Sequence, residues 1–323
     1  MTIRGAGISM TVILGVAFPA VHWSPRAQAQ VKLEFKFPEG QNLTYKSIAR
    51  TRQVLTLNGM NRDSVLRETK LCSRSVGKRR DDSTLPVDEK VQFLRAEYTL
   101  MDGTKLTLDS SDPNIKIDNP QLAFLADVFK LENTITYTLV LDKQSKVKAI
   151  EGTEKLKEEA EKLTDSIARD EFQHATGVDR LKTKFEQAFC ILPDTPLHAG
   201  EPWERSELLE INGKAFTVRK KYEYVGTEKN GDRIFEKISQ KVLEVKYDID
   251  PKEKLPLKVV KSDLKVQSSE GTILFDSEEG HIASSSQKIR FKGNMTFSGA
   301  GVDQTGEFDL TFDLNTQLQP AAK

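Results

Sequence analysis

Alternation of apolar and polar residues with a period of two is the feature that most constrains the fold of this chain. Successive side chains of a β-strand point to opposite faces, so alternation predicts strands with one buried and one solvated face. The pattern recurs along most of the sequence, in segments 33–37, 135–141, 243–249, 289–291, 295–297 and 308–314. The sequence therefore predicts a mainly β protein.

Short turn signals separate many of these segments. Asn58-Gly59, Asp102-Gly103, Asn212-Gly213 and Asn230-Gly231 are dipeptides that accept the positive φ angles of two-residue hairpin loops. They predict strands that return antiparallel to their predecessors, as curved sheets that are wet on one face and dry on the other.

One block departs from the alternation. Residues 151–168 are rich in Glu, Lys, Leu and Ala, and residues 177–189 place Val178, Leu181 and Phe185 on one face of a helix. Pro193 and Pro196 then end helical structure. A shorter helix is expected at 120–130, with Asn119 as its N-cap and Pro120 at its first position.

The fold class expected is thus mainly β (α+β), with antiparallel, curved sheet in two β-rich halves separated by a helical segment. The boundaries expected are a signal peptide at 1–29, a first β-rich half at 30–150, a helical segment at 151–192, a second β-rich half at 193–316 and a tail at 317–323. The two halves are weakly alike, and duplication or generic hairpin chemistry would both explain the likeness.

The N-terminal stretch has the three parts of a secretory signal peptide in order. Arg4 supplies a positive start, residues 8–21 are apolar, and Ala27-Gln28-Ala29 matches the small-x-small pattern read by signal peptidase. Cleavage is expected before Gln30, which predicts an exported protein, periplasmic or extracellular, without a transmembrane segment. The alternative is a retained anchor, although the apolar run is short for a membrane span.

Charge argues against two classes of partner. Loss of Arg4 and Arg26 with the signal peptide lowers the basic residues from 48 to 46, against 48 acidic residues, so the mature net charge is −2. Nucleic-acid binding needs a clustered basic surface, and so does capture by anionic lipid. Neither partner is expected.

Two cysteines remain in the exported chain, Cys72 and Cys190. An oxidising compartment allows them to form one disulfide, which would tie the first β-rich half to the end of the helical segment. Two separately buried, reduced thiols are the alternative.

The sequence contains none of the spacings that identify common catalytic or cofactor sites. There is no HExxH, no GxSxG and no glycine-rich phosphate loop, and the remaining histidines do not cluster. We therefore expect no catalytic residue, no bound metal and no cofactor, and favour a protein that is not an enzyme. Trp203, the only tryptophan after cleavage, is a candidate ligand contact or a core residue.

The chain resembles uncharacterised families of exported bacterial β-rich proteins. The resemblance rests on the segment from Gly271 to Ile282, a strand, a glycine-containing acidic turn and a returning strand, and on the Gly-Glu-Pro-Trp run that ends at Trp203. It covers the second β-rich half well and the first poorly, and it implies no activity. Element order gives a more distant architectural likeness to periplasmic lipoprotein carriers.

Three function classes follow. The first is a non-catalytic envelope protein that binds an apolar or amphipathic ligand in a curved sheet. The second is a structural or protein-interaction module with a closed core, and the third is an exported hydrolase without a recognisable motif. The interior of the sheet separates them, according to whether it is filled, hollow or polar.

Overall fold

The computed structural model describes residues 30–117, 122–189, 191–211, 214–249, 258–299 and 302–320. Its strands are long, and most exceed fourteen residues. They are β1 (Asn42–Leu57), β2 (Met60–Val76), β3 (Leu85–Thr99), β4 (Lys105–Asp109), β5 (Thr136–Leu141), β6 (Val147–Glu151), β7 (Pro202–Ile211), β8 (Lys214–Asn230), β9 (Arg233–Tyr247), β10 (Lys258–Asp276), β11 (His281–Gly299) and β12 (Val302–Leu318).

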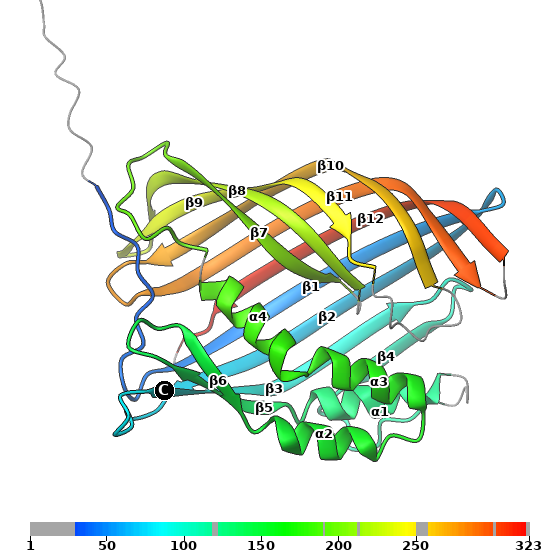
Figure 1. Cartoon of the computed structure of the whole chain (residues 1–323), viewed down its shortest axis with the longest axis horizontal. Coiled ribbons are helices and arrows are strands. Elements are labelled where there is room, and N and C mark those ends of the chain that lie inside the picture. The colour runs from blue at the N-terminus through cyan, green and yellow to red at the C-terminus, as the bar shows by residue number, and fades with distance from the viewer. Residues whose placement is uncertain are drawn as a thin grey trace, which may run out of the picture.

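All twelve strands belong to one curved antiparallel sheet (Figure 1). The strand order is β6-β5-β3-β2-β1-β12-β11-β10-β9-β8-β7, and β4 pairs with β3. The long β1–β12 ladder, from Tyr45↔Leu318 to Thr56↔Glu307, joins the two β-rich segments at the centre of the sheet. Antiparallel pairing and the mainly β class are therefore confirmed, and the sheet stays open, with β6 and β7 as its edge strands.

Hairpin turns lie where the glycine signals placed them. Asn58 and Gly59 both have positive φ, 51° and 77°, in the two-residue loop between β1 and β2. This pair of positive angles defines the turn whose twist matches that of the flanking strands. Gly103 and Gly231 also have positive φ, in the turns after β3 and β8, and Asn212-Gly213 lies outside the described residues.

Each strand separates an inner, concave face from an outer one. On β12 the buried Phe308, Leu310 and Phe312 face inward, while Asp309 and Asp313 lie on the other face. Outer charges pair across strands, as in Arg52–Asp63 and Arg290–Asp309, both 2.6 Å. Register shifts between β8 and β9 and between β10 and β11 mark bulges, which bend a sheet.

A helical segment after β6 is confirmed, although it holds three helices where two helical stretches, 151–168 and 177–189, were expected. Three helices follow β6: α2 (Thr153–Glu161), α3 (Ser166–Ala175) and α4 (Val178–Phe189). They pack with α1 (Ala123–Glu132) on the concave side of the sheet, where Leu156, Leu181 and Phe185 join one apolar cluster with β3, β5 and β6. The expected cap of the first helix, Asn119-Pro120, lies outside the described residues.

Residues 33–37 form no strand, although their alternation predicted one. The segment runs extended along one end of the sheet (Figure 1), held by the isolated bridge Val31↔Leu197 and by the Lys36 N–H, which donates to the Gly280 carbonyl at 2.9 Å. Leu33 is buried and Lys36 exposed. Alternation thus identified which side chains are buried. It did not predict that the segment has no neighbouring strand to pair with.

Candidate functional site

Helix α4 spans the gap between the two edges of the open sheet (Figure 1). On one side, Leu181 and Phe185 pack in the cluster that contains Val147 and Ile150 of β6. On the other side, Arg180 forms an ion pair with Glu210 of β7. The Gln187 side-chain oxygen also accepts the Leu208 N–H of the same edge strand at 2.8 Å. Both edges of the sheet are therefore tied to one helix.

The inward face of α4 is not covered by protein. At 100° per residue, Lys184 and Ala188 fall between the side that meets β7 and the side that packs on β6. Both are exposed. The opposite side of the helix, with Asp179, Lys182 and Thr183, faces solvent. From the exposure of these two side chains we infer a water-accessible space between α4 and the sheet.

The floor of this space is formed by the inner faces of β1 and β2. Arg74 of β2 points toward the helix, because its guanidinium lies 5.3 Å from the Phe189 ring and 5.9 Å from the Tyr45 ring. Cys72 and Lys70 share the inner face of β2 by the period of two. We call this space the α4 cleft and define it by its half-buried or exposed residues Tyr45, Ser47, Lys70, Cys72, Arg74, Lys184 and Ala188.

A charged pair occupies one end of the α4 cleft. Arg74 is ion-paired to Glu89 of the neighbouring strand, with only 17% and 11% of the two side chains exposed. Burial raises the pKa of the adjacent Tyr45 to about 12, so its hydroxyl stays protonated at neutral pH. This end of the cleft is polar, but its charges are mutually satisfied.

Lys184 occupies the roof in a different electrostatic state. Burial among the surrounding elements lowers its pKa, and the charge of Lys70 lowers it further. A side chain that touches water and is nevertheless desolvated lies in an enclosed, water-containing space. Burial raises the pKa of the Cys72 thiol, so this cysteine lacks the stabilised thiolate that a nucleophile needs.

A groove of about 680 Å³ opens beside the α4 cleft. Leu33 and Phe35 of the N-terminal segment, the β5–β6 turn and Phe189 line it. Phe189 also packs against Phe35 and Phe37, with ring centroids 5.6 and 5.2 Å away. The Phe189 ring contacts Arg74 as well, so this side chain borders both the groove and the cleft.

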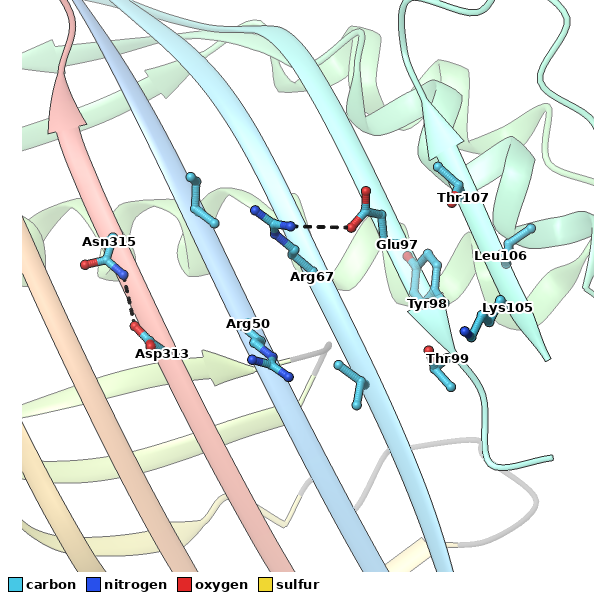
Figure 2. A pocket seen from close by; sticks show the side chains of 12 residues that line it. Arg50, Arg67, Glu97, Tyr98, Thr99, Lys105, Leu106, Thr107, Asp313 and Asn315 are labelled. Atoms are coloured by element: carbon cyan, nitrogen blue, oxygen red, sulfur yellow. Dashed lines mark hydrogen bonds and ion pairs between the residues drawn. The ribbon is translucent and has the colours of Figure 1, made fainter. Parts of the chain in front are cut away.

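The outer face of the sheet carries a second groove, of about 620 Å³ (Figure 2). Arg50, Arg67 and Glu97 line it, on the face turned away from the helices. Arg67 lies 3.9 Å from Glu97, and the Asn315 amide donates to Asp313 at 3.0 Å. The groove is open and five of its twelve lining residues are charged, so it offers no enclosed apolar surface.

The residues singled out from sequence fall in different places. Trp203 is half-buried outside the α4 cleft, where it stacks on Tyr222 with centroids 5.6 Å apart and donates its indole N–H to the Ile191 carbonyl at 2.7 Å. Its contact with a ligand stays a prediction. Cys72 lies on the cleft floor, and Cys190 lies outside the described residues, so their disulfide also stays a prediction.

Sequence reasoning missed Lys70, Arg74 and Lys184. In β2 the inner positions read Leu66, Glu68, Lys70, Cys72 and Arg74, which breaks the apolar alternation that identified other strands. The signal that could have found them is this unusual run of polar residues at alternate positions. It becomes informative only when the inner face of β2 is known.

The part of the chain that the structure describes contains no group of three or more metal-binding side chains. Within the same residues, no helix is long and apolar enough to cross a membrane.

Residues 87–282, more than half of the chain, match the family described as "Family of unknown function (DUF6263)". The expected resemblance to an uncharacterised family is confirmed, and the match extends into the first β-rich half, where little likeness was expected. No curated protein matches the chain.

Several solved structures match the chain at very low identity and low TM-score. A lipovitellin structure concerned with lipid–protein interactions is 9% identical with a TM-score of 0.38, and the match covers 89% of this chain but 26% of lipovitellin. An outer membrane channel from Pseudomonas putida F1 is 8% identical (TM-score 0.21, 88% and 98% covered). A DUF1329 family protein from Desulfovibrio piger is 7% identical (TM-score 0.13, 88% of each chain covered). Likeness this weak carries no functional argument.

Proposed function

The chain belongs to the DUF6263 family, whose function is unknown, and we propose that it is a non-catalytic binding protein that holds an amphipathic ligand in the α4 cleft. One observation carries the proposal: Lys184 and Ala188 face the sheet but remain exposed. A helix that spans both sheet edges without filling the space beneath it is the arrangement expected of a ligand site.

The lining of the cleft suits a ligand with both apolar and polar parts. Tyr45, Ala188 and the neighbouring Phe189 offer apolar and aromatic surface, while Lys70 and Lys184 offer charge. The groove that Phe189 lines lies beside the cleft and offers further apolar surface from Leu33 and Phe35.

Export of the protein is part of the same proposal. It rests on residues 1–29, whose charge, apolar run and Ala27-Gln28-Ala29 motif suit a signal peptide. It is supported by the position of the residues that would follow cleavage, since the Gln30 amide lies 2.8 Å from the His198 ring. Leu33, three residues later, is buried.

The alternative of a hydrolase has one observation in its favour, a lysine of lowered pKa in an enclosed space. A binding protein is favoured over it because the pKa of the Cys72 thiol is raised and because the two carboxylates that act on Lys184, Glu210 and Glu89, are held by arginines. Such groups position charge rather than transfer protons.

Filling the space beneath α4 tests the proposal. A fluorescent palmitate analogue should bind residues 30–323 saturably, and Ala188→Phe should weaken binding by tenfold or more, on the order of 1.4 kcal/mol. Thr183→Phe, on the solvent side of the same helix, is the matched control and should bind like the wild type.

Trp203 supplies an internal signal in the wild type. Its fluorescence should change with the same midpoint as the probe if the ligand reaches β7. Absence of saturable binding by both fluorescence and calorimetry would overturn the proposal and leave the closed-core interaction module.

A further inference from the structure

Several cations that point into the concave side of the sheet have a carboxylate partner. Arg74 pairs with Glu89, and Arg180 with Glu210. Lys220, buried on β8, lies 2.8 Å from Glu207 of β7. Such pairing is the rule for desolvated charges, because an isolated ion loses hydration without compensation.

Lys70 and Lys184 are exceptions to this rule. Within the described residues, neither ammonium group forms a hydrogen bond or an ion pair. Lys70 lies on the inner face of β2 and Lys184 on the side of α4 between its two sheet contacts, so the two side chains enter the α4 cleft from opposite walls. Both also act on the thiol of Cys72.

The carboxylates nearby do not neutralise this pair. Glu89 and Glu210 are engaged by Arg74 and Arg180. Burial raises the pKa of Glu132, on α1, which weakens its value as a counter-ion. Glu68, the neighbour of Lys70 on the inner face of β2, contacts neither lysine within ion-pair distance in the described structure. The two ammonium groups thus create a local need for negative charge.

We propose that the ligand of the α4 cleft is an amphipathic anion whose carboxylate or phosphate head group is held between Lys70 and Lys184. This inference rests on the proposed function and adds the charge of the ligand. An anion between two ammonium groups removes their repulsion and forms charge-assisted hydrogen bonds to both. The tail then lies along Ala188 and the ring of Phe189, toward the groove that Phe189 lines beside the cleft.

Ligands of equal chain length and different charge test the inference. Decanoate, decyl phosphate, decanol and decylammonium are titrated calorimetrically into residues 30–323. Both anions should bind at least tenfold more tightly than decanol, and decylammonium more weakly still. Whichever of decanoate and decyl phosphate binds more tightly identifies the head group as carboxylate or phosphate.

Neutral variants of equal length locate the head group. Lys184→Met and Lys70→Met should each reduce the affinity for the anion about tenfold, the value of one charged hydrogen bond, and leave decanol binding unchanged. Lys182→Met is the control, because Lys182 lies on the outer side of α4, 3.8 Å from Glu186. Unfolding curves of each variant verify that it is folded.

Dependence on pH gives an independent measurement. Affinity for decanoate should fall as the pH rises through the lowered pKa of Lys184, because the neutral amine no longer attracts the anion, and Lys184→Met should lose this dependence. The groups that act on Lys184 are Lys70 and Cys72 of β2, Glu89 of β3, Glu210 of β7 and Glu132 of α1.

The results separate the two proposals. Equal affinity for decanol and both anions, insensitive to the lysine variants, would overturn the anion inference and preserve a binding site for apolar chains. Failure of every ligand to bind would overturn the proposed function itself.

Discussion

The two sides of the concave face use their interior positions differently. Across β8, β9, β11 and β12, inward side chains meet one another and exclude water, with Phe216, Phe291 and Phe308 fully buried in one cluster. On β2 and at the start of β1, inward side chains such as Tyr45, Lys70 and Cys72 stay half-exposed beneath α4. The first region closes by curling the sheet onto itself, and the second is closed only by a helix held at its two sides.

This difference assigns stability and binding to separate parts of one sheet. A packed aromatic core contributes folding free energy through burial, whereas an enclosed polar space contributes little and can accept a ligand. Substitutions in the two regions should therefore differ in sign and size, and each of the following tests that division.

The largest effect is expected in the closed region. Phe291→Ala removes a ring that is fully buried and 5.0 Å from Phe216, and it should lower the free energy of unfolding by about 3–5 kcal/mol. Phe189→Ala, at the wall of the α4 cleft and half-buried, should cost about 1–2 kcal/mol. Urea unfolding measures both, and equal losses would show that the two regions are packed alike.

The next effect concerns the charged end of the cleft. Arg74→Met leaves the Glu89 carboxylate largely buried without a partner, and it should cost about 2–4 kcal/mol. The double variant Arg74→Met/Glu89→Gln should recover part of the loss, because the uncompensated charge is gone. A double variant no more stable than the single one would indicate that Arg74 acts through packing on Phe189 instead.

The free energy of unfolding should depend on pH through a buried histidine at the start of β11. Burial lowers the pKa of His281, at the start of β11, below its usual 6.5, against opposing effects of Asp276 and Glu279. Neutral His281 therefore contributes fully to the free energy of unfolding above pH 6.5. This contribution is lost as the pH falls, because the unfolded chain binds a proton at a pH where the folded protein does not. His281→Gln should flatten the pH dependence of the free energy of unfolding between pH 7 and pH 5, as urea unfolding at each pH measures.

The smallest change in the free energy of unfolding is expected for the unpaired lysine of the α4 cleft, compared with a paired lysine of the closed region. Lys184→Met should change the free energy of unfolding by no more than about 0.5 kcal/mol, and in the stabilising direction, because it removes an unpaired and partly desolvated charge. Lys220→Met leaves the Glu207 carboxylate without its ion-pair partner, and it should instead lower the free energy of unfolding by about 2–3 kcal/mol. Thermal unfolding measures both variants. Equal losses of stability would contradict the assignment of stability to the closed region and binding to the α4 cleft.

Local features of the fold were readable from the sequence because they depend on neighbours in the chain. Alternation fixes which residues of β12 share a face, and the Asn58-Gly59 pair specifies a tight reversal between β1 and β2. Composition likewise placed the helices after β6. Even where the strand assignment of 33–37 was wrong, the alternation separated buried Leu33 from exposed Lys36.

The candidate site depended on contacts between distant residues, which no local pattern encodes. Pairing of β1 with β12 makes one sheet of two β-rich segments, and only then do β6 and β7 become edges that α4 can bridge. From sequence alone, the polar inner positions of β2 look like an irregular strand. Their role becomes visible only when the structure shows α4 above them. The sequence determined periodicity, turns and helix positions, whereas the tertiary structure decided which faces meet and where water stays between them, because side-chain burial is settled by long-range packing.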